Sequence, residues 1–126
     1  TLFATFSLLL FTISAQAQIS GAIFRDFNGN GTKDLAEPLM PGITVQAYNS
    51  AGALCGSVVS VSSTGTTNYT LTGCGTGDVR VEFIINSVGV CVDPAFDQNA
   101  LGGSQYGSSV QFVKGNSTNV NFALYD

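Results

Sequence analysis

The five residues Val79-Arg80-Val81-Glu82-Phe83 decide the fold class, because apolar and charged side chains alternate along them. Successive side chains of a β-strand point to opposite faces, so this alternation predicts a strand with one buried face and one wet face. Six further segments have the same period or a strand-like composition, and these are residues 19–25, 43–48, 54–61, 68–73, 110–112 and 120–124. No window has the period of an amphipathic helix. We therefore expect an all-β chain, folded as an antiparallel seven-stranded β-sandwich.

The N-terminal segment has the pattern of a secretory signal peptide. Residues 2–13 form an uncharged apolar run, and an Ala-x-Ala cleavage signature follows at residues 15–17. About 12 apolar residues are too few for the ~20 that a membrane-spanning helix needs, so we expect no membrane span. Residues 1–17 are thus predicted to be a signal peptide that is incomplete at its start, and residues 18–126 to be one exported domain.

The charged residues exclude some classes of function. Four basic residues stand against eight acidic ones, which gives a formal net charge of −4. We expect no nucleic-acid partner, because phosphate binding needs clustered Lys and Arg side chains. We also expect no enzyme, since the chain has no histidine and its serines and threonines lack a partner base.

Residues 26–37 read D-F-N-G-N-G-T-K-D-L-A-E, which matches the calcium-loop pattern D-x-[DN]-x-[DN]-G-x5-E. Calcium binds six to eight oxygen atoms, so a loop can wrap around it with ligands on alternate residues. The predicted ligands are the side chains of Asp26, Asn28, Asn30, Asp34 and Glu37 and the backbone carbonyl of Thr32. The alternative is a polar, glycine-rich turn without an ion. We favour the ion, because three carboxylates so close in sequence repel one another without a cation.

The surroundings of this loop differ from those of an EF-hand. The residues before it, 19–24, read as a strand rather than a helix, and Pro38 and Pro41 prevent a regular helix after it. Lys33 also occupies position 8, where paired EF loops carry an apolar residue. We therefore predict a structural calcium site between the first two strands and not a sensor that moves helices.

The three cysteines, Cys55, Cys74 and Cys91, suggest one disulfide in an exported chain. If residues 54–61 and 68–73 form a hairpin that turns at Thr64-Gly65, opposed residues have numbers that sum to about 129. Cys55 and Cys74 meet this condition, so we favour a bond between them, while the Cys74–Cys91 pairing stays open. Residues 85–108 are long for a connection, and we expect an extra short strand at 88–92 and then a surface loop.

The calcium loop and its flanks resemble the opening of SdrD B-like domains, which are also called serine-aspartate repeat B domains and are related to the Cna-B group. The resemblance rests on S-G-A-I-F-R-D-F-N-G-N-G-T-K-D at residues 20–34, on E-P at 37–38 and on P-G-I-T-V at 41–45. Residues 68–71, 77–81 and 120–124 look like later strands of the family, with departures at Asn68 and Leu71. The cysteines also depart from its usual pattern, and Arg25 stands where an isopeptide-forming lysine would be needed.

The resemblance implies a prealbumin-like, Ig-like β-sandwich in a secreted or cell-surface bacterial protein. It implies calcium as the cofactor, held by the six loop residues named above, and neighbouring domains of a longer chain as partners. We expect a non-catalytic structural or adhesion module that calcium stiffens, with an extracellular protein or glycan as its ligand. The alternative is an accessory module of a larger secreted enzyme, which binds a ligand such as a carbohydrate through Tyr48, Tyr106 or Tyr125.

Overall fold

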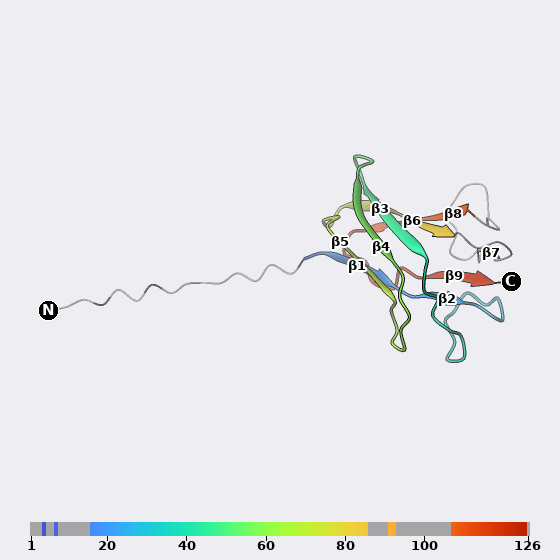
Figure 1. The fold of residues 1–126 in the computed structure, drawn as a ribbon. Helices are drawn as coiled ribbons and strands as arrows, with labels where there is room; N and C mark the ends of the chain where they lie inside the picture. The colour runs from blue at the N-terminus through green and yellow to red at the C-terminus, as the bar shows by residue number, and fades with distance from the viewer. Residues whose placement is uncertain (1–3, 5–6, 8–15, 86–90, 93–106, 126) are drawn as a thin grey trace.

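The computed structural model describes residues 4, 7, 16–85, 91–92 and 107–125 (Figure 1). Its strands are β1 (Gln18–Gly21), β2 (Ile23–Arg25), β3 (Thr44–Asn49), β4 (Leu54–Val59), β5 (Tyr69–Thr72), β6 (Asp78–Ile85), β7 (Cys91–Val92), β8 (Gly107–Lys114) and β9 (Phe122–Tyr125). None of the described residues lies in a helix, so the all-β prediction is confirmed. It follows that the described segments include no helix that could cross a membrane.

The strands form two layers. One layer is the sheet β4-β3-β6-β8, and the other contains the smaller sheets β1-β5 and β2-β9-β7. The two smaller sheets are continuous with each other, because only Ala22 separates β1 from β2 and Ser20 O accepts a hydrogen bond from Val120 N at 3.0 Å. Figure 1 shows β3, β6 and β8 above β1, β2 and β9. This arrangement is consistent with a β-sandwich. All described strand pairs are antiparallel except β2 with β9, which is parallel.

The core lies between the two layers. Val79, Val81 and Phe83 of β6 are 0–2% exposed, whereas Arg80 between them is exposed, as the alternation predicts. Phe83 stacks on Phe122 of the opposite layer with ring centroids 4.5 Å apart. The Tyr69 ring meets Phe83 edge-on at 5.9 Å. These aromatic contacts join β5, β6 and β9 across the sandwich. Stacked and edge-on packing of aromatic rings is favourable, so the contacts stabilise the two layers against each other.

The predicted first strand, residues 19–25, is divided at Ala22. Ala22 N donates a hydrogen bond to the Asn121 side chain at 2.9 Å instead of to a neighbouring strand. At Gly21 the chain passes so close to the segment before β9 that a Cβ atom would lie 2.0 Å from Val120 O, which only glycine avoids. With this division and β7, the described residues form nine strand segments where the sequence predicts seven. β7 lies within the predicted extra strand at 88–92, while residues 88–90 and the surface loop expected after β7 lie outside the described residues.

The predicted hairpin of residues 54–61 and 68–73 is wrong. β4 pairs with β3 and β5 pairs with β1, so the two segments belong to different layers. Only the start of the hairpin is present, where Val61 N donates to Asn68 O at 3.0 Å. Beyond this bond the two segments stay close without forming a ladder, because a Cβ atom at Gly56 would lie 3.1 Å from Leu71 Cδ2 and one at Gly73 would lie 2.9 Å from Cys55 O. A disulfide joins Cys55 and Cys74 with their Cα atoms 5.0 Å apart. The favoured pairing is therefore present, but it links two layers rather than two neighbours in one sheet.

Candidate metal centre

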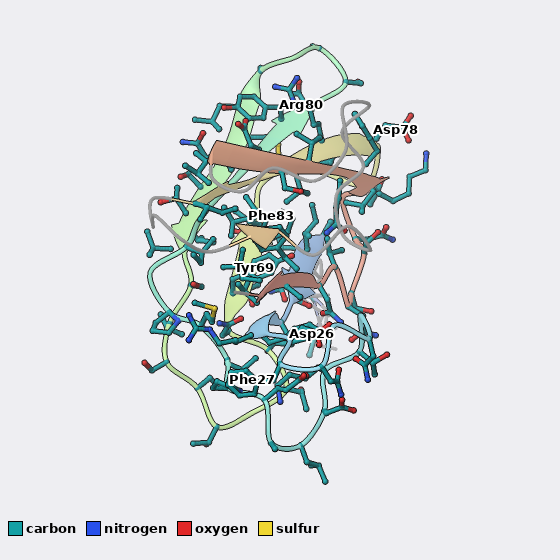
Figure 2. The ribbon with its side chains drawn as sticks, turned by 90° about the vertical axis from the view of Figure 1, so that its right-hand side faces the viewer. Asp26, Phe27, Tyr69, Asp78, Arg80 and Phe83 are labelled. Carbon is teal, nitrogen blue, oxygen red and sulfur yellow. A yellow bond between two sulfur atoms is a disulfide. The ribbon has the colours of Figure 1, made fainter. Side chains whose placement is uncertain are left out.

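The loop of residues 26–37 begins directly after β2, and the chain that leaves it runs back beside β2. Asp26 N donates a hydrogen bond to Leu124 O at 2.8 Å, which ties the start of the loop to β9. After the loop the chain returns along β2, where Arg25 N donates to Pro38 O at 3.0 Å and Met40 N donates to Ile23 O at 2.7 Å. The two ends of the loop are thus held next to each other. Figure 2 shows Asp26 and Phe27 in the lower part of the molecule as it is drawn there.

Asp26, at position 1 of the loop, has a side chain that is only 1% exposed. Its Oδ1 accepts hydrogen bonds from Gly29 N at 2.7 Å and Asn30 N at 3.3 Å, and its Oδ2 accepts one from Gly31 N at 2.7 Å. Gly31 has a φ of 74°, which favours glycine and produces the sharp turn at position 6. A single carboxylate therefore gathers the backbone of the first half of the loop.

Glu37, at position 12, is also buried, with 5% of its surface exposed. Its Oε1 accepts a hydrogen bond from Phe27 N, and its Oε2 accepts one from Asp34 N, both at 2.9 Å. Both oxygens thus face into the loop rather than into solvent. This orientation is the one that a closing, two-oxygen ligand at position 12 requires.

The side chains at positions 3, 5 and 9 meet at one point. Asn28 Nδ2 and Asn30 Nδ2 both donate hydrogen bonds to Asp34 Oδ2, at 2.8 and 3.0 Å. Their own Oδ1 atoms accept hydrogen bonds from the backbone of Asn30 and Thr32. Amide groups carry an oxygen and a nitrogen of nearly the same shape, so a half-turn would present oxygen to a cation at the same place.

The chemistry of these residues fits a hard cation. Calcium takes carboxylate, amide and backbone carbonyl oxygens, and the loop offers all three kinds. The described residues contain no group of three or more His, Cys, Asp or Glu side chains that could hold a metal. The three carboxylates of the predicted ligand set, Asp26, Asp34 and Glu37, therefore do not form such a group in this structure, and the remaining predicted oxygens are those of Asn28, Asn30 and Thr32. For Thr32 the structure gives a backbone N–H that bonds Asn30, and the ligand role of its carbonyl stays a prediction.

Asn68 holds the two segments that flank the loop together, a role that its place in the sequence does not predict. The residue is 3% exposed, and its Oδ1 accepts a hydrogen bond from Ile23 N at 2.8 Å. Its Nδ2 donates to Met40 O at 2.8 Å and to Ile23 O at 3.2 Å. One amide group thus ties the strand that enters the loop to the segment that leaves it. An asparagine after a polar turn gives no sequence signal for such a buried position.

Of the three tyrosines predicted as ligand-binding residues, the structure describes the side chain of one. Tyr48 is half-buried, with the Arg80 guanidinium 4.5 Å from its ring centroid. Tyr106 and the side chain of Tyr125 lie outside what the structure describes. Only Tyr48 can therefore be placed against a surface of the sandwich.

Comparison with protein-family models finds no match, and comparison with curated proteins finds none. The likeness to SdrD B-like domains therefore rests on the residues quoted above and stays a prediction.

Proposed function

We propose that this chain is a non-catalytic structural or adhesion module, stiffened by a calcium ion, of a secreted or cell-surface bacterial protein. Its fold would be the prealbumin-like, Ig-like sandwich of SdrD B-like domains, with β1 and β2 counted as one strand and β7 as an addition to the seven. The observation that carries the proposal is that the loop folds around its own oxygen-bearing side chains. The side chains at positions 3, 5 and 9 meet, and the carboxylates at positions 1 and 12 accept hydrogen bonds from backbone N–H groups of the loop.

The ion would be held by Asp26, Asn28, Asn30, Asp34 and Glu37 with the Thr32 carbonyl. Its contribution would be to neutralise three carboxylates, two of which are buried at the anchored ends of the loop. Any ligand that binds the folded chain and not the unfolded chain raises the free energy of unfolding, by ~2.7 kcal/mol at 100 times its dissociation constant. Since small domains have only ~5–15 kcal/mol in total, this is a large share of their stability.

A melting experiment tests the proposal. Calcium at about 100 times its dissociation constant should raise the melting midpoint by about 10 °C over the value in chelator, because a domain of ~100 residues gains ~4 °C per kcal/mol. Glu37→Gln should abolish most of this shift. The matched control is Glu82→Gln, the same chemical change on β6 and outside the loop, and it should keep the full shift. A parent chain that melts at the same temperature with calcium and with chelator would refute the proposal, as would a full shift in Glu37→Gln.

A second candidate function, the accessory ligand-binding module, is favoured by a pocket beside Tyr48 on the four-stranded sheet. The two functions are compatible, because the pocket is formed by β3, β6 and β8 whereas the loop follows β2.

A further inference from the structure

The four-stranded sheet has a pocket of about 780 Å³ at one end. Its floor includes a row of three side chains, because Tyr48 of β3 lies opposite Arg80 of β6 and Arg80 lies opposite Phe112 of β8. Neighbouring strands are ~4.8 Å apart, so the three side chains stand next to one another on the same face of the sheet. The volume falls within the ~300–1,000 Å³ of small-ligand sites. Figure 2 shows Arg80 and Asp78 at the opposite end of the molecule from Asp26 and Phe27.

Arg80 presents a cation whose hydrogen-bond donors are available. Its guanidinium lies 4.5 Å from the Tyr48 ring centroid, a distance at which the ring attracts the cation. Among the described residues, Lys114 forms an ion pair with Asp78. The Arg80 guanidinium, by contrast, forms neither an ion pair nor a hydrogen bond with the protein. The Tyr48 ring therefore orients a planar fork of N–H groups that faces solvent. Such a fork matches a carboxylate, which it can bind through two parallel hydrogen bonds.

Phe112 supplies an apolar surface beside this fork. Its side chain is 64% exposed, although it lies on a strand whose other face packs into the core. One face of a sugar ring consists of C–H bonds with partly positive hydrogens, which complement the negative face of an aromatic ring. The pocket lining also includes Asp78, whose carboxylate can accept hydrogen bonds from sugar hydroxyl groups.

We propose that Tyr48, Arg80 and Phe112 form a binding site for an acidic saccharide, a sugar unit that carries a carboxylate. The sugar ring packs on Phe112, and its carboxylate pairs with Arg80, which Tyr48 holds in place. Charge complementarity decides the choice, because a carboxylate offers the exposed guanidinium a charged acceptor with two oxygens, which a neutral sugar lacks. This inference rests on the adhesion role proposed above and gives it a class of ligand. It does not depend on the calcium loop.

The test is a titration of the folded chain with a galacturonate trisaccharide and with maltotriose, a neutral trisaccharide of the same length. Chelator is present throughout, so that the acidic sugar has no calcium to bind and the result does not depend on the loop. The parent should bind the galacturonate and bind maltotriose at least tenfold more weakly, since a hydrogen-bonded charge pair is worth about one factor of ten or more. Arg80→Gln and Phe112→Ala should each weaken galacturonate binding by about tenfold. The matched control is Phe27→Ala, a similarly exposed phenylalanine at the other end of the molecule, and it should bind as the parent does.

Three results would overturn the inference: no galacturonate binding by the parent, equal binding of the two sugars, or unchanged binding in Arg80→Gln. Melting midpoints of all variants show whether a loss of binding is a loss of folding. Arg80→Lys gives a second test, because it keeps the charge but removes the planar fork, so it too should bind the galacturonate more weakly. If calcium proves to have no effect on melting while this selectivity is observed, the saccharide site stands and only the calcium proposal fails.

Discussion

Two regions of the sandwich are closed by different kinds of contact. At the edge where β4 and β5 approach from opposite layers, the Cys55–Cys74 disulfide joins β4 covalently to the residues that follow β5. At the loop after β2, by contrast, the chain is closed by carboxylates that accept backbone N–H groups, with Asp26 at one end and Glu37 at the other. The first closure responds to reductant and hardly to ions. The second holds buried negative charge, so it should respond to cations and to any change in that charge.

The largest expected effect comes from removing both closures together. Replacing Cys55 and Cys74 with alanine should lower the free energy of unfolding by ~3 kcal/mol, because the disulfide spans 19 residues and restricts the unfolded chain. Removing calcium should lower it by a further ~2.7 kcal/mol. The two losses should add to within ~0.5 kcal/mol, since the regions share no residues. Urea unfolding of the parent and the double alanine variant, each in calcium and in chelator, measures all the terms.

A calcium effect that shrinks or grows by more than this margin in the alanine variant would contradict the separation of the two regions. It would mean that the edge of β4 and β5 and the loop form one cooperative unit. Asn68 is the residue that could couple them, because its backbone accepts a hydrogen bond from Val61 and its side chain bonds Ile23 and Met40.

A smaller effect is expected from changing the charge of the loop in the absence of calcium. Asp26→Asn replaces one carboxylate oxygen with an N–H₂ group, so one backbone N–H in the loop loses its charged acceptor. This should lower the free energy of unfolding in chelator by ~2 kcal/mol. Asp78→Asn is the matched control, because Asp78 pairs with Lys114 while both side chains stay 63–77% exposed, and surface pairs are worth under ~1 kcal/mol. Equal losses in the two variants, measured by urea unfolding, would show that burial of Asp26 has no energetic consequence.

The sequence predicted the strands well, because their period is a local property. The alternation at Val79–Phe83 identified β6, and the structure extends that strand by one residue before and two after. The sequence could not predict which strands pair. Residues 61 and 68 do face each other as a hairpin requires, but whether two strands then stay in one sheet depends on which layer offers each of them a buried surface. The cysteine pairing survived this error, since a disulfide needs only the short distance between the two residues.

The loop shows the same limit in a different form. The spacing of its oxygen-bearing residues predicted which side chains would come together, and Asn28, Asn30 and Asp34 do meet. The anchoring of the loop could not be predicted, because it depends on Asn68, 42 residues after Asp26, and on the backbone of β9. Contacts between distant parts of the chain leave no periodic pattern in the sequence.

The smallest expected effect concerns Tyr69, which lies on β5, the strand that precedes the disulfide-bonded Cys74, and is held by a polar contact. Its hydroxyl donates a hydrogen bond to Val120 O, and burial raises the pKa of this phenol above its usual value. The unfolded chain therefore loses this proton from about pH 10, while the folded chain retains it. The stabilisation is complete below about pH 10 and falls as the pH rises further. Tyr69→Phe should cost ~1 kcal/mol at neutral pH, and its free energy of unfolding should fall less steeply than the parent's above pH 10. Urea unfolding from pH 7 to 11 measures both effects, and parallel curves for parent and variant would show that Tyr69 does not cause the alkaline loss.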